Sequence, residues 1–203
     1  MTGRERQKQR TRTALVEAYH ELVRQGQSPT VAQVAEAARV SVATAYRYFP
    51  NPESLRADAA VAAARTQPDF AAVLGAAGDD PVQRIEVLVR AIATWQLSDE
   101  PVWRGVLRAT LERWFAQHDE GAAVPIPVRS NARAEVVTLA LRPLQAELPA
   151  DEFRRLVNQV MLVCGVEAMI ASRDAAGLDP EEAEETMVAA ARTLVIAARA
   201  NGR

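Results

Sequence analysis

The chain has 203 residues, of which 49% are hydrophobic and 25% charged, and it carries a formal net charge of −2. This balance excludes a disordered chain, and the length allows one large or two small domains. No apolar run approaches the ~20 residues of a membrane span, and the N-terminal segment lacks the apolar core of a signal peptide. We therefore expect a cytoplasmic protein, whose single cysteine, Cys164, excludes an internal disulfide.

The residue pattern favours an all-α fold. Only 5% of the residues are aromatic, alanine is abundant, and β-branched residues do not alternate with polar residues over the length of a strand. Residues 1–65 hold ten Lys and Arg against six Asp and Glu, a charge of +4, so residues 66–203 hold 14 against 20, or −6. A basic module on an acidic body is typical of a protein that places one face on DNA phosphates.

The first twelve residues form a basic segment, in which every second residue from Arg4 to Arg12 is a lysine or arginine. We predict a flexible arm, or a frayed first helical turn, that lies along phosphates or enters the minor groove. The alternative is a solvated charge run that serves only solubility. A helix from about Leu15 to Val23 follows, and its single apolar stripe should pack on the next two helices.

Residues 30–49 predict two short helices joined by a tight turn. Thr30 and Gln33 form a T-x-x-Q capping box at the start of the first helix, and Ser41 is a suitable N-cap for the second. The buried face of the first helix is formed by Val31, Val34, Ala35 and Ala38. This is a helix-turn-helix pattern, in which the second helix enters the major groove of DNA.

The outer face of the second helix carries the side chains expected to reach DNA. They are Val42, Ala43, Thr44, Tyr46 and Arg47. The first three suit thymine methyl groups and base edges. Tyr46, together with Thr30, Tyr48 and the basic segment, suits phosphates. The alternative is a helical hairpin within an all-α core, but tyrosine and arginine on a short outer face favour DNA binding.

These residues resemble the N-terminal signature of the TetR family of one-component transcriptional regulators. The matching residues are Val40-Ser41, Thr44, Tyr46, Tyr48-Phe49-Pro50 and Glu53-Ser54-Leu55. The resemblance covers about the first 65 residues, the size of one small DNA-binding module. It implies an N-terminal three-helix helix-turn-helix domain, a linker helix, and a larger α-helical domain that binds a small-molecule effector and dimerises.

Two positions depart from the family pattern. Arg39 stands in the turn where a glycine is usual, and a left-handed backbone at this residue costs about 1 kcal/mol. Pro52 stands at the start of the linker helix, where family members often place a lysine that contacts a phosphate. Both departures concern the surface that would face DNA.

Two boundaries follow the DNA-binding module. Pro50-Asn51-Pro52 predicts a turn, and an alanine-rich linker helix spans Glu53–Arg65. The prolines and glycines between Thr66 and Asp80 predict a loose hinge. We therefore divide the chain into a DNA-binding domain with its linker helix, residues 1–65, and an effector-binding and dimerisation domain, residues 66–203.

The second domain is predicted to contain five helices. They span about 81–97, 98–118, 129–148, 151–174 and 180–200, with a loop at 121–127. The last two are apolar over more than one face, so they need partners on several sides. We predict a symmetric four-helix dimer interface within residues 151–200, and the alternative is a buried helix pair in a monomer.

Large side chains cluster on the middle helices of this domain. They are Trp95, Trp103, Trp114, Phe115, Met161 and Met169. Because rigid rings and pliable methionines shape apolar cavities, we predict an effector site here. Its predicted residues are Trp95, Trp103 and Met161, with Glu112 and Asn158 as polar contacts. Ordinary core packing is the alternative.

The sequence shows no constellation for catalysis or metal binding, since it has one cysteine, two distant histidines and no Gly-rich phosphate loop. We therefore expect no cofactor and no enzyme, although a small all-α enzyme remains the weakest alternative.

Together these features predict a homodimeric transcriptional regulator, with a repressor favoured. It would place two recognition helices ~34–36 Å, or a multiple, apart in a pseudo-palindromic DNA operator and be released by an apolar or aromatic effector. A DNA-binding protein with a solid body and no effector is the alternative. The predicted DNA contacts are Arg10, Arg12, Thr30, Gln33, Ser41, Val42, Ala43, Thr44, Tyr46, Arg47 and Tyr48.

Overall fold

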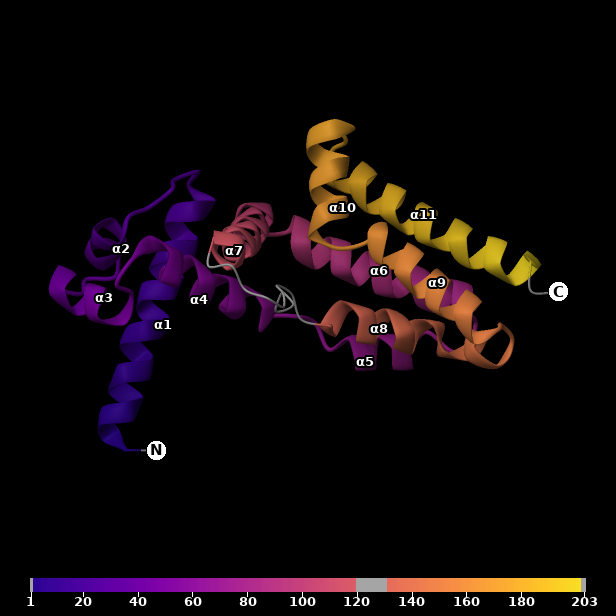
Figure 1. Cartoon of the computed structure of the whole chain (residues 1–203), viewed down its shortest axis with the longest axis horizontal. Helices are drawn as coiled ribbons and strands as arrows, with labels where there is room; N and C mark the ends of the chain where they lie inside the picture. Colours follow the sequence, from indigo (N-terminus) through magenta and orange to yellow (C-terminus); the bar gives the residue numbers. More distant parts are fainter. Residues whose placement is uncertain (1, 120–130, 202–203) are drawn as a thin grey trace. The chain divides into compact units, whose positions relative to one another are not determined.

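The computed structural model describes residues 2–119 and 131–201, and within these ranges the chain is helical and has no strand (Figure 1). The helices pack into two compact units. Unit 1 contains α1 (Gly3–Arg24), α2 (Val31–Ala37), α3 (Val42–Tyr48), α4 (Pro52–Ala64) and α7 (Glu100–Asp119). Unit 2 contains α5 (Phe70–Gly75), α6 (Pro81–Leu97), α8 (Ala132–Leu141), α9 (Ala150–Leu162), α10 (Val166–Ile170) and α11 (Pro180–Asn201). The all-α fold predicted from the sequence is confirmed.

The core of unit 1 lies between the helix-turn-helix and the two helices that flank it. Its most deeply buried large side chains, each at most 1% exposed, are Leu15, Val31, Val34 and Leu55. They come from α1, α2 and α4, whose apolar stripes face one another. The sequence predicted a core of α1 with the two helices of the helix-turn-helix, and α3 does contribute Ala45 to it, but the contribution of α4 was not predicted.

The basic N-terminal segment is helical, which makes the prediction of a flexible arm wrong. α1 begins at Gly3 because Thr2 and Glu5 form a capping box: the Thr2 amide donates to the Glu5 carboxylate at 2.6 Å, and the Glu5 amide donates to Thr2 Oγ1 at 3.3 Å. The residues that follow are mostly glutamine, lysine and arginine, which are good helix formers. The helix therefore extends well ahead of the core.

The capping signals predicted for the helix-turn-helix are present. The Thr30–Gln33 capping box starts α2, and Ser41 Oγ accepts a hydrogen bond from the Thr44 amide at 3.2 Å at the start of α3. Arg39 in the turn between them has φ = 55°, the left-handed conformation for which the resemblance led us to expect a glycine. The turn therefore keeps its backbone geometry despite the substitution, at a cost of about 1 kcal/mol.

α7 packs in unit 1, along α1 and α4, although it follows α6 in the sequence. The guanidinium of Arg56 in α4, which is only 8% exposed, donates to Glu112 of α7 at 2.8 Å. Arg24 of α1 donates to Asp99, just before α7, at 2.8 Å. By packing, the chain thus divides differently from the predicted ranges 1–65 and 66–203, because the partners of α7 lie in the first range.

Unit 2 is built around α6, whose N-cap Asp80 and first residue Pro81 are those predicted. α6 packs against α11, α8 and α5. The fully buried side chains of this core larger than alanine are Ile85, Leu88, Val89, Val137, Leu141, Leu144, Val160 and Val195. The start of α11 is also as predicted, since the Asp179 carboxylate accepts a hydrogen bond from the Glu182 amide at 2.9 Å.

Two elements of unit 2 differ from the sequence prediction. The hinge expected between Thr66 and Asp80 contains α5, which starts because Asp69 accepts a hydrogen bond from the Ala72 amide at 3.0 Å and which buries Phe70. The helix expected over 151–174 is broken at Gly165, where φ is 101°, and the two parts are bent by 44°.

The remaining second-domain predictions fall on α8 and on the loop. α8 gives way to a short 3₁₀ helix at Arg142–Ala146, so the helix predicted over 129–148 is in two parts. The predicted loop at 121–127 lies outside the described residues. No single described helix is long and apolar enough to cross a membrane, although α9 together with the bent segment Val166–Ala175 meets the criteria of length and composition.

Candidate nucleic-acid interface

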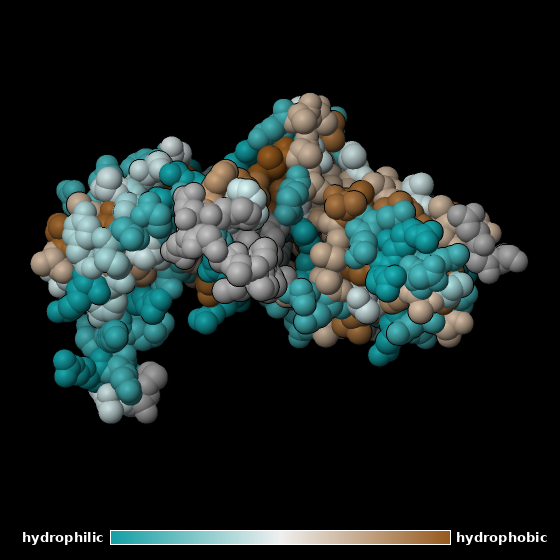
Figure 2. Space-filling view, in the orientation of Figure 1, coloured by the Kyte–Doolittle hydropathy of each residue, from teal (hydrophilic) through white to brown (hydrophobic). Residues whose placement is uncertain are grey.

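α3 packs on the core of unit 1 by one face and exposes the side chains of its outer face. Ala45 is fully buried against the core and anchors the helix. Away from the core, Val42 is 46% exposed and Tyr46 is 44% exposed, and Ala43 is also exposed. Figure 2 shows a small hydrophobic area at the end of α3, within a mostly hydrophilic surface of unit 1. An apolar area of this size suits thymine methyl groups in a major groove.

Two predicted base-contacting or phosphate-contacting side chains of α3 are partly buried. Thr44 Oγ1 accepts a hydrogen bond from Ser41 Oγ at 2.8 Å, so its hydroxyl is oriented by the cap. Tyr48 lies under the Arg47 guanidinium, whose central carbon is 5.9 Å from the ring centroid. A cation held over an aromatic ring is restricted in its rotamers, so the exposed Arg47 is positioned before any contact with DNA.

Thr30 and Gln33 lie together at the start of α2, and both are exposed. The Thr30 hydroxyl donates to Gln33 Oε1 at 2.9 Å, and the Thr30 amide donates to the same oxygen at 2.8 Å. The Gln33 side-chain amide N–H groups take no part in these bonds. Of this pair, Gln33 Nε2 is therefore the donor best placed to contact a phosphate.

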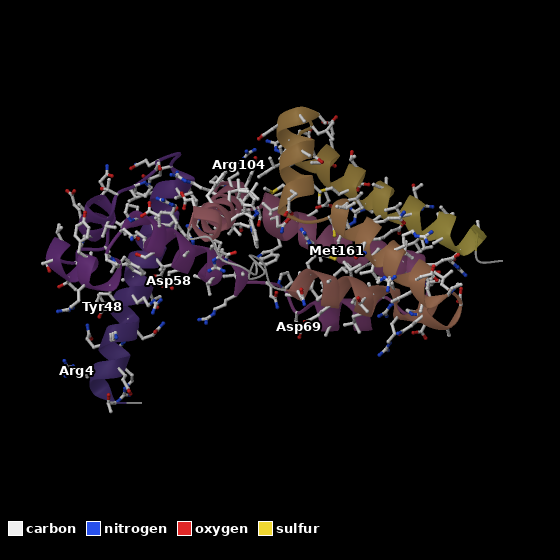
Figure 3. The ribbon with its side chains drawn as sticks, viewed as in Figure 1. Arg4, Tyr48, Asp58, Asp69, Arg104 and Met161 are labelled. Carbon is white, nitrogen blue, oxygen red and sulfur yellow. The ribbon has the colours of Figure 1, made fainter. Side chains whose placement is uncertain are left out.

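Arg12 has a role that the sequence analysis missed. Its guanidinium forms a two-pronged ion pair with Asp58 of α4, which is labelled in Figure 3. The guanidinium also lies 5.9 Å from the Phe49 ring centroid. The hydrogen bond to Asp58 raises the pKa of Arg12. Since this side chain ties α1 to α4, we remove it from the proposed DNA contacts. Arg10 remains exposed on α1.

The five predicted effector contacts fall in both units. Trp103 is buried in unit 1, whereas Trp95 and Met161 are half-buried against the core of unit 2 and Asn158 is exposed on α9. Trp95 meets Phe70 edge to face, with 6.0 Å between ring centroids.

Glu112 is an ion-pair partner and not an open polar contact. It accepts hydrogen bonds from Arg56 at 2.8 Å and from Arg108 at 3.0 Å. Burial raises the pKa of Glu112, but the two arginines outweigh that effect and the net pKa is lowered. The carboxylate therefore holds α7 in unit 1, and we withdraw it from the effector site.

One polar residue in unit 2 was missed by the sequence analysis. Gln96 is only 5% exposed, and its Oε1 has no hydrogen-bond partner among the residues that the structure describes. It continues the buried face of α6 formed by Leu88, Val89, Ile92 and Ala93. The sequence carried a signal for this residue, since Gln96 stands at a core position of an apolar stripe. A buried amide without a partner is destabilising, so its presence there calls for a reason.

The described residues contain no group of three or more His, Cys, Asp or Glu side chains that could hold a metal ion. Cys164 is buried, and burial raises its pKa to about 11. A thiol in this state is protonated at neutral pH and does not act as a nucleophile.

Comparison with known proteins agrees with this interface. The family model described as bacterial regulatory proteins, tetR family, matches residues 14–59, which span the end of α1 to α4. A crystal structure of a TetR transcriptional regulator from Rhodococcus sp. RHA1 has the same fold, with a TM-score of 0.55 and 17% sequence identity over 94% of this chain and 98% of that chain. No curated protein matches the sequence. Residues 14–59 are thus similar to the DNA-binding region of the tetR family, and the chain shares the all-helical fold of the Rhodococcus regulator.

Proposed function

We propose that the protein is a homodimeric repressor that binds a pseudo-palindromic operator and is released by a small, largely apolar effector. The observation that carries the DNA-binding part is the exposed outer face of α3, where Val42, Ala43 and Tyr46 surround a helix start fixed by Ser41. Two such helices would occupy major grooves ~34–36 Å, or a multiple, apart.

The roles within this surface follow from chemistry. Val42, Ala43 and the oriented hydroxyl of Thr44 face base edges, whereas Tyr46 and Tyr48 reach phosphates through their hydroxyl groups. Gln33 adds a donor from the start of α2. Base contacts determine which operator is preferred, and phosphate contacts determine how tightly any sequence is held.

Thr44→Ala and Tyr46→Phe test this division of roles. We expect Thr44→Ala to change the preferred operator sequence, as measured by selection from a random duplex library. Tyr46→Phe should weaken binding to all sequences about equally. A change of base preference in Tyr46→Phe would show that the two roles are assigned wrongly. Circular dichroism of both variants controls for an intact fold.

The proposal of an effector rests on Gln96 and its surroundings in unit 2. A buried carbonyl oxygen without a donor costs about 1–3 kcal/mol, so a chain that keeps one usually has a use for it. Half-buried Trp95 and Met161 pack against the same core. We infer a mainly apolar effector with a hydroxyl or N–H group that donates to Gln96 Oε1, and Asn158 as a second polar contact.

Release of DNA by candidate compounds tests the effector. Active compounds should weaken operator binding about 5- to 150-fold, which needs only ~1–3 kcal/mol of preference for the non-binding form. Gln96→Leu should abolish the response to compounds with a donor group, and Trp95→Ala should reduce it to all compounds. The matched control is Gln159→Leu, an exposed glutamine on α9. If a broad panel of apolar and aromatic compounds never releases DNA, a regulator without an effector replaces this proposal.

Repression itself is tested in a reporter assay. Transcription from a promoter that contains the selected operator should fall when the protein is present and recover when an active compound is added. A rise in transcription would instead identify an activator.

A further inference from the structure

α1 extends far beyond the part of it that packs. The helix begins at Gly3, but its first buried residue is Leu15. Nearly all residues before Ala14 are exposed, and Figure 2 shows a hydrophilic surface on this extension. An isolated helix of this length is marginal in water, so the extension depends on the packed half of α1 and on its capping box. Core packing gives no reason for these residues.

The cations of the extension lie on two opposite faces. With about 100° per residue, Arg4 and Lys8 lie within about 20° of Leu15 around the helix axis, on the face that enters the core. Arg6 and Arg10 lie about 180° and 140° from Leu15, on the outer face, so Arg10, which the sequence predicted as a DNA contact, is not among the contacts proposed below. The apolar stripe of α1 thus continues as a basic stripe where the helix leaves the core.

The inner stripe leads toward the helix-turn-helix. Its last cation is Arg12, which is already neutralised by Asp58 of α4. The structure pairs neither Arg4 nor Lys8 with a carboxylate among the residues that it describes. In Figure 3, Arg4 projects from α1 on the side where α3 and Tyr48 lie. The unpaired charges are therefore on the same side of α1 as the recognition helix.

We propose that residues 3–12 form a rigid phosphate-binding rod, whose Arg4 and Lys8 contact the backbone of the operator duplex beside the base pairs that α3 faces. Helical residues 3–12 span about 15 Å, which corresponds to about four base pairs at ~3.4 Å each. The contacts are independent of sequence and lengthen the footprint of each protomer. The inference rests on the proposed operator binding and adds a second surface to it.

Two double variants with equal charge removal test which face binds. Arg4→Gln with Lys8→Gln removes the inner pair, and Arg6→Gln with Arg10→Gln removes the outer pair; glutamine preserves helix propensity. Operator affinity is measured against salt concentration. Four phosphate contacts in a dimer contribute about 3.6 to the magnitude of the slope of log K against log salt concentration. The slope of the inner variant should therefore be smaller by about 3.6, and the slope of the outer variant should change little. Equal losses in both variants, or a larger loss in the outer one, would overturn the proposal.

Two further measurements complete the test. The difference between the variants should vanish on a duplex trimmed to the base pairs under α3, because the flanking phosphates are then missing. Gln9→Pro breaks the helix without changing charge and should reduce the slope as the inner variant does, whereas Gln9→Ala should not. If residues 3–12 acted as a flexible arm, Gln9→Pro would leave the slope unchanged. Wild-type protein that fails to select any operator contradicts the proposed function, while selective binding with equal slopes contradicts the rod alone.

Discussion

The Arg133 side chain of α8 occupies the space that a side chain on Gly165 would need. A Cβ atom placed on Gly165 would overlap the Arg133 guanidinium, which donates to the Cys164 carbonyl at 3.1 Å and to Glu167 at 2.9 Å. Gly165 also has φ = 101° and ψ = −178°, a conformation that is essentially confined to glycine. The break between α9 and α10 is thus held by an arginine that fits only over a glycine.

Gly165→Ala should therefore destabilise unit 2 by about 3 kcal/mol, from backbone strain and from displacement of Arg133. Gly177→Ala is the matched control, because Gly177 has φ = 67° but no atom within 4 Å of an added Cβ, so only strain of about 1 kcal/mol remains. Urea unfolding measures both. Adding Arg133→Ala to Gly165→Ala should restore the part of the unfolding free energy that is lost through overlap of the new Cβ with Arg133. If the losses of the two single substitutions simply add, this account is contradicted.

Arg84 is a buried cation that joins the C-terminal ends of α5 and α8 and the loop that follows α5. It is 7% exposed and donates to the carbonyl oxygens of Ala140, Leu74, Gly78 and Leu139 at 2.8–3.1 Å. The last carbonyls of a helix lack partners within it and favour a cation. Arg84→Met should cost about 3 kcal/mol of unfolding free energy, since four acceptors lose their donor. Arg90→Met, at an exposed ion pair on the same helix, should cost no more than about 1 kcal/mol. Similar losses in urea unfolding for both variants would contradict the assigned role.

His20 should make unit 1 less stable in mild acid. Its Nε2 lies 3.1 Å from the Ala59 carbonyl, and because a carbonyl only accepts, this nitrogen carries a proton. Burial is the largest cause of a pKa lowered from the usual 6.5, and the nearby Arg24 lowers it further. The unfolded chain therefore binds a proton first as pH falls. The stability that neutral His20 provides is complete above pH ~6.5 and is lost as pH falls through the folded pKa.

His20→Gln keeps a donor to Ala59 and removes the titration. The unfolding free energy of each protein is measured between pH 8 and pH 5. As the pH falls through this window, the wild-type protein should lose more stability than the variant does. Parallel curves would show that His20 does not contribute to the pH dependence.

The proposed dimerisation through α11 predicts the effect of a charge on the outer face of that helix. Ile196 is 47% exposed and Ala197 is exposed in the single chain, so an arginine at 197 costs little unless a partner covers it. In a close-packed dimer the same charge would be desolvated, at several kcal/mol. Ala197→Arg and Ala190→Arg should therefore sediment as monomers at micromolar concentration. Ala71→Arg, at an exposed alanine of α5, should remain dimeric. Dimers of both α11 variants would place the interface elsewhere.

Local signals in the sequence were sufficient for the elements that begin with a cap. Thr30, Ser41 and Asp80 start their helices where the sequence predicts, because an N-cap and its partner lie three residues apart. The capping box of Thr2 and Glu5 carries the same signal, but the basic run hid it. Pairs distant in sequence were not predictable: Arg12 meets Asp58, and Arg56 meets Glu112, 56 residues away. The break at Gly165 depends on Arg133 of another helix in the same way.

The position of α7 limits what can be cut from this protein. Residues 1–66 contain the whole helix-turn-helix, yet a fragment ending there would lose Glu112 and leave the buried Arg56 guanidinium with Glu53 as its remaining carboxylate. The same fragment would lose Asp99, the partner of Arg24, and the side of α1 and α4 that α7 covers would face water. The DNA-binding part is therefore not a transferable cassette. A hybrid regulator made by joining this N-terminal segment to another body would need α7, or an equivalent helix with a carboxylate opposite Arg56, to be grafted with it.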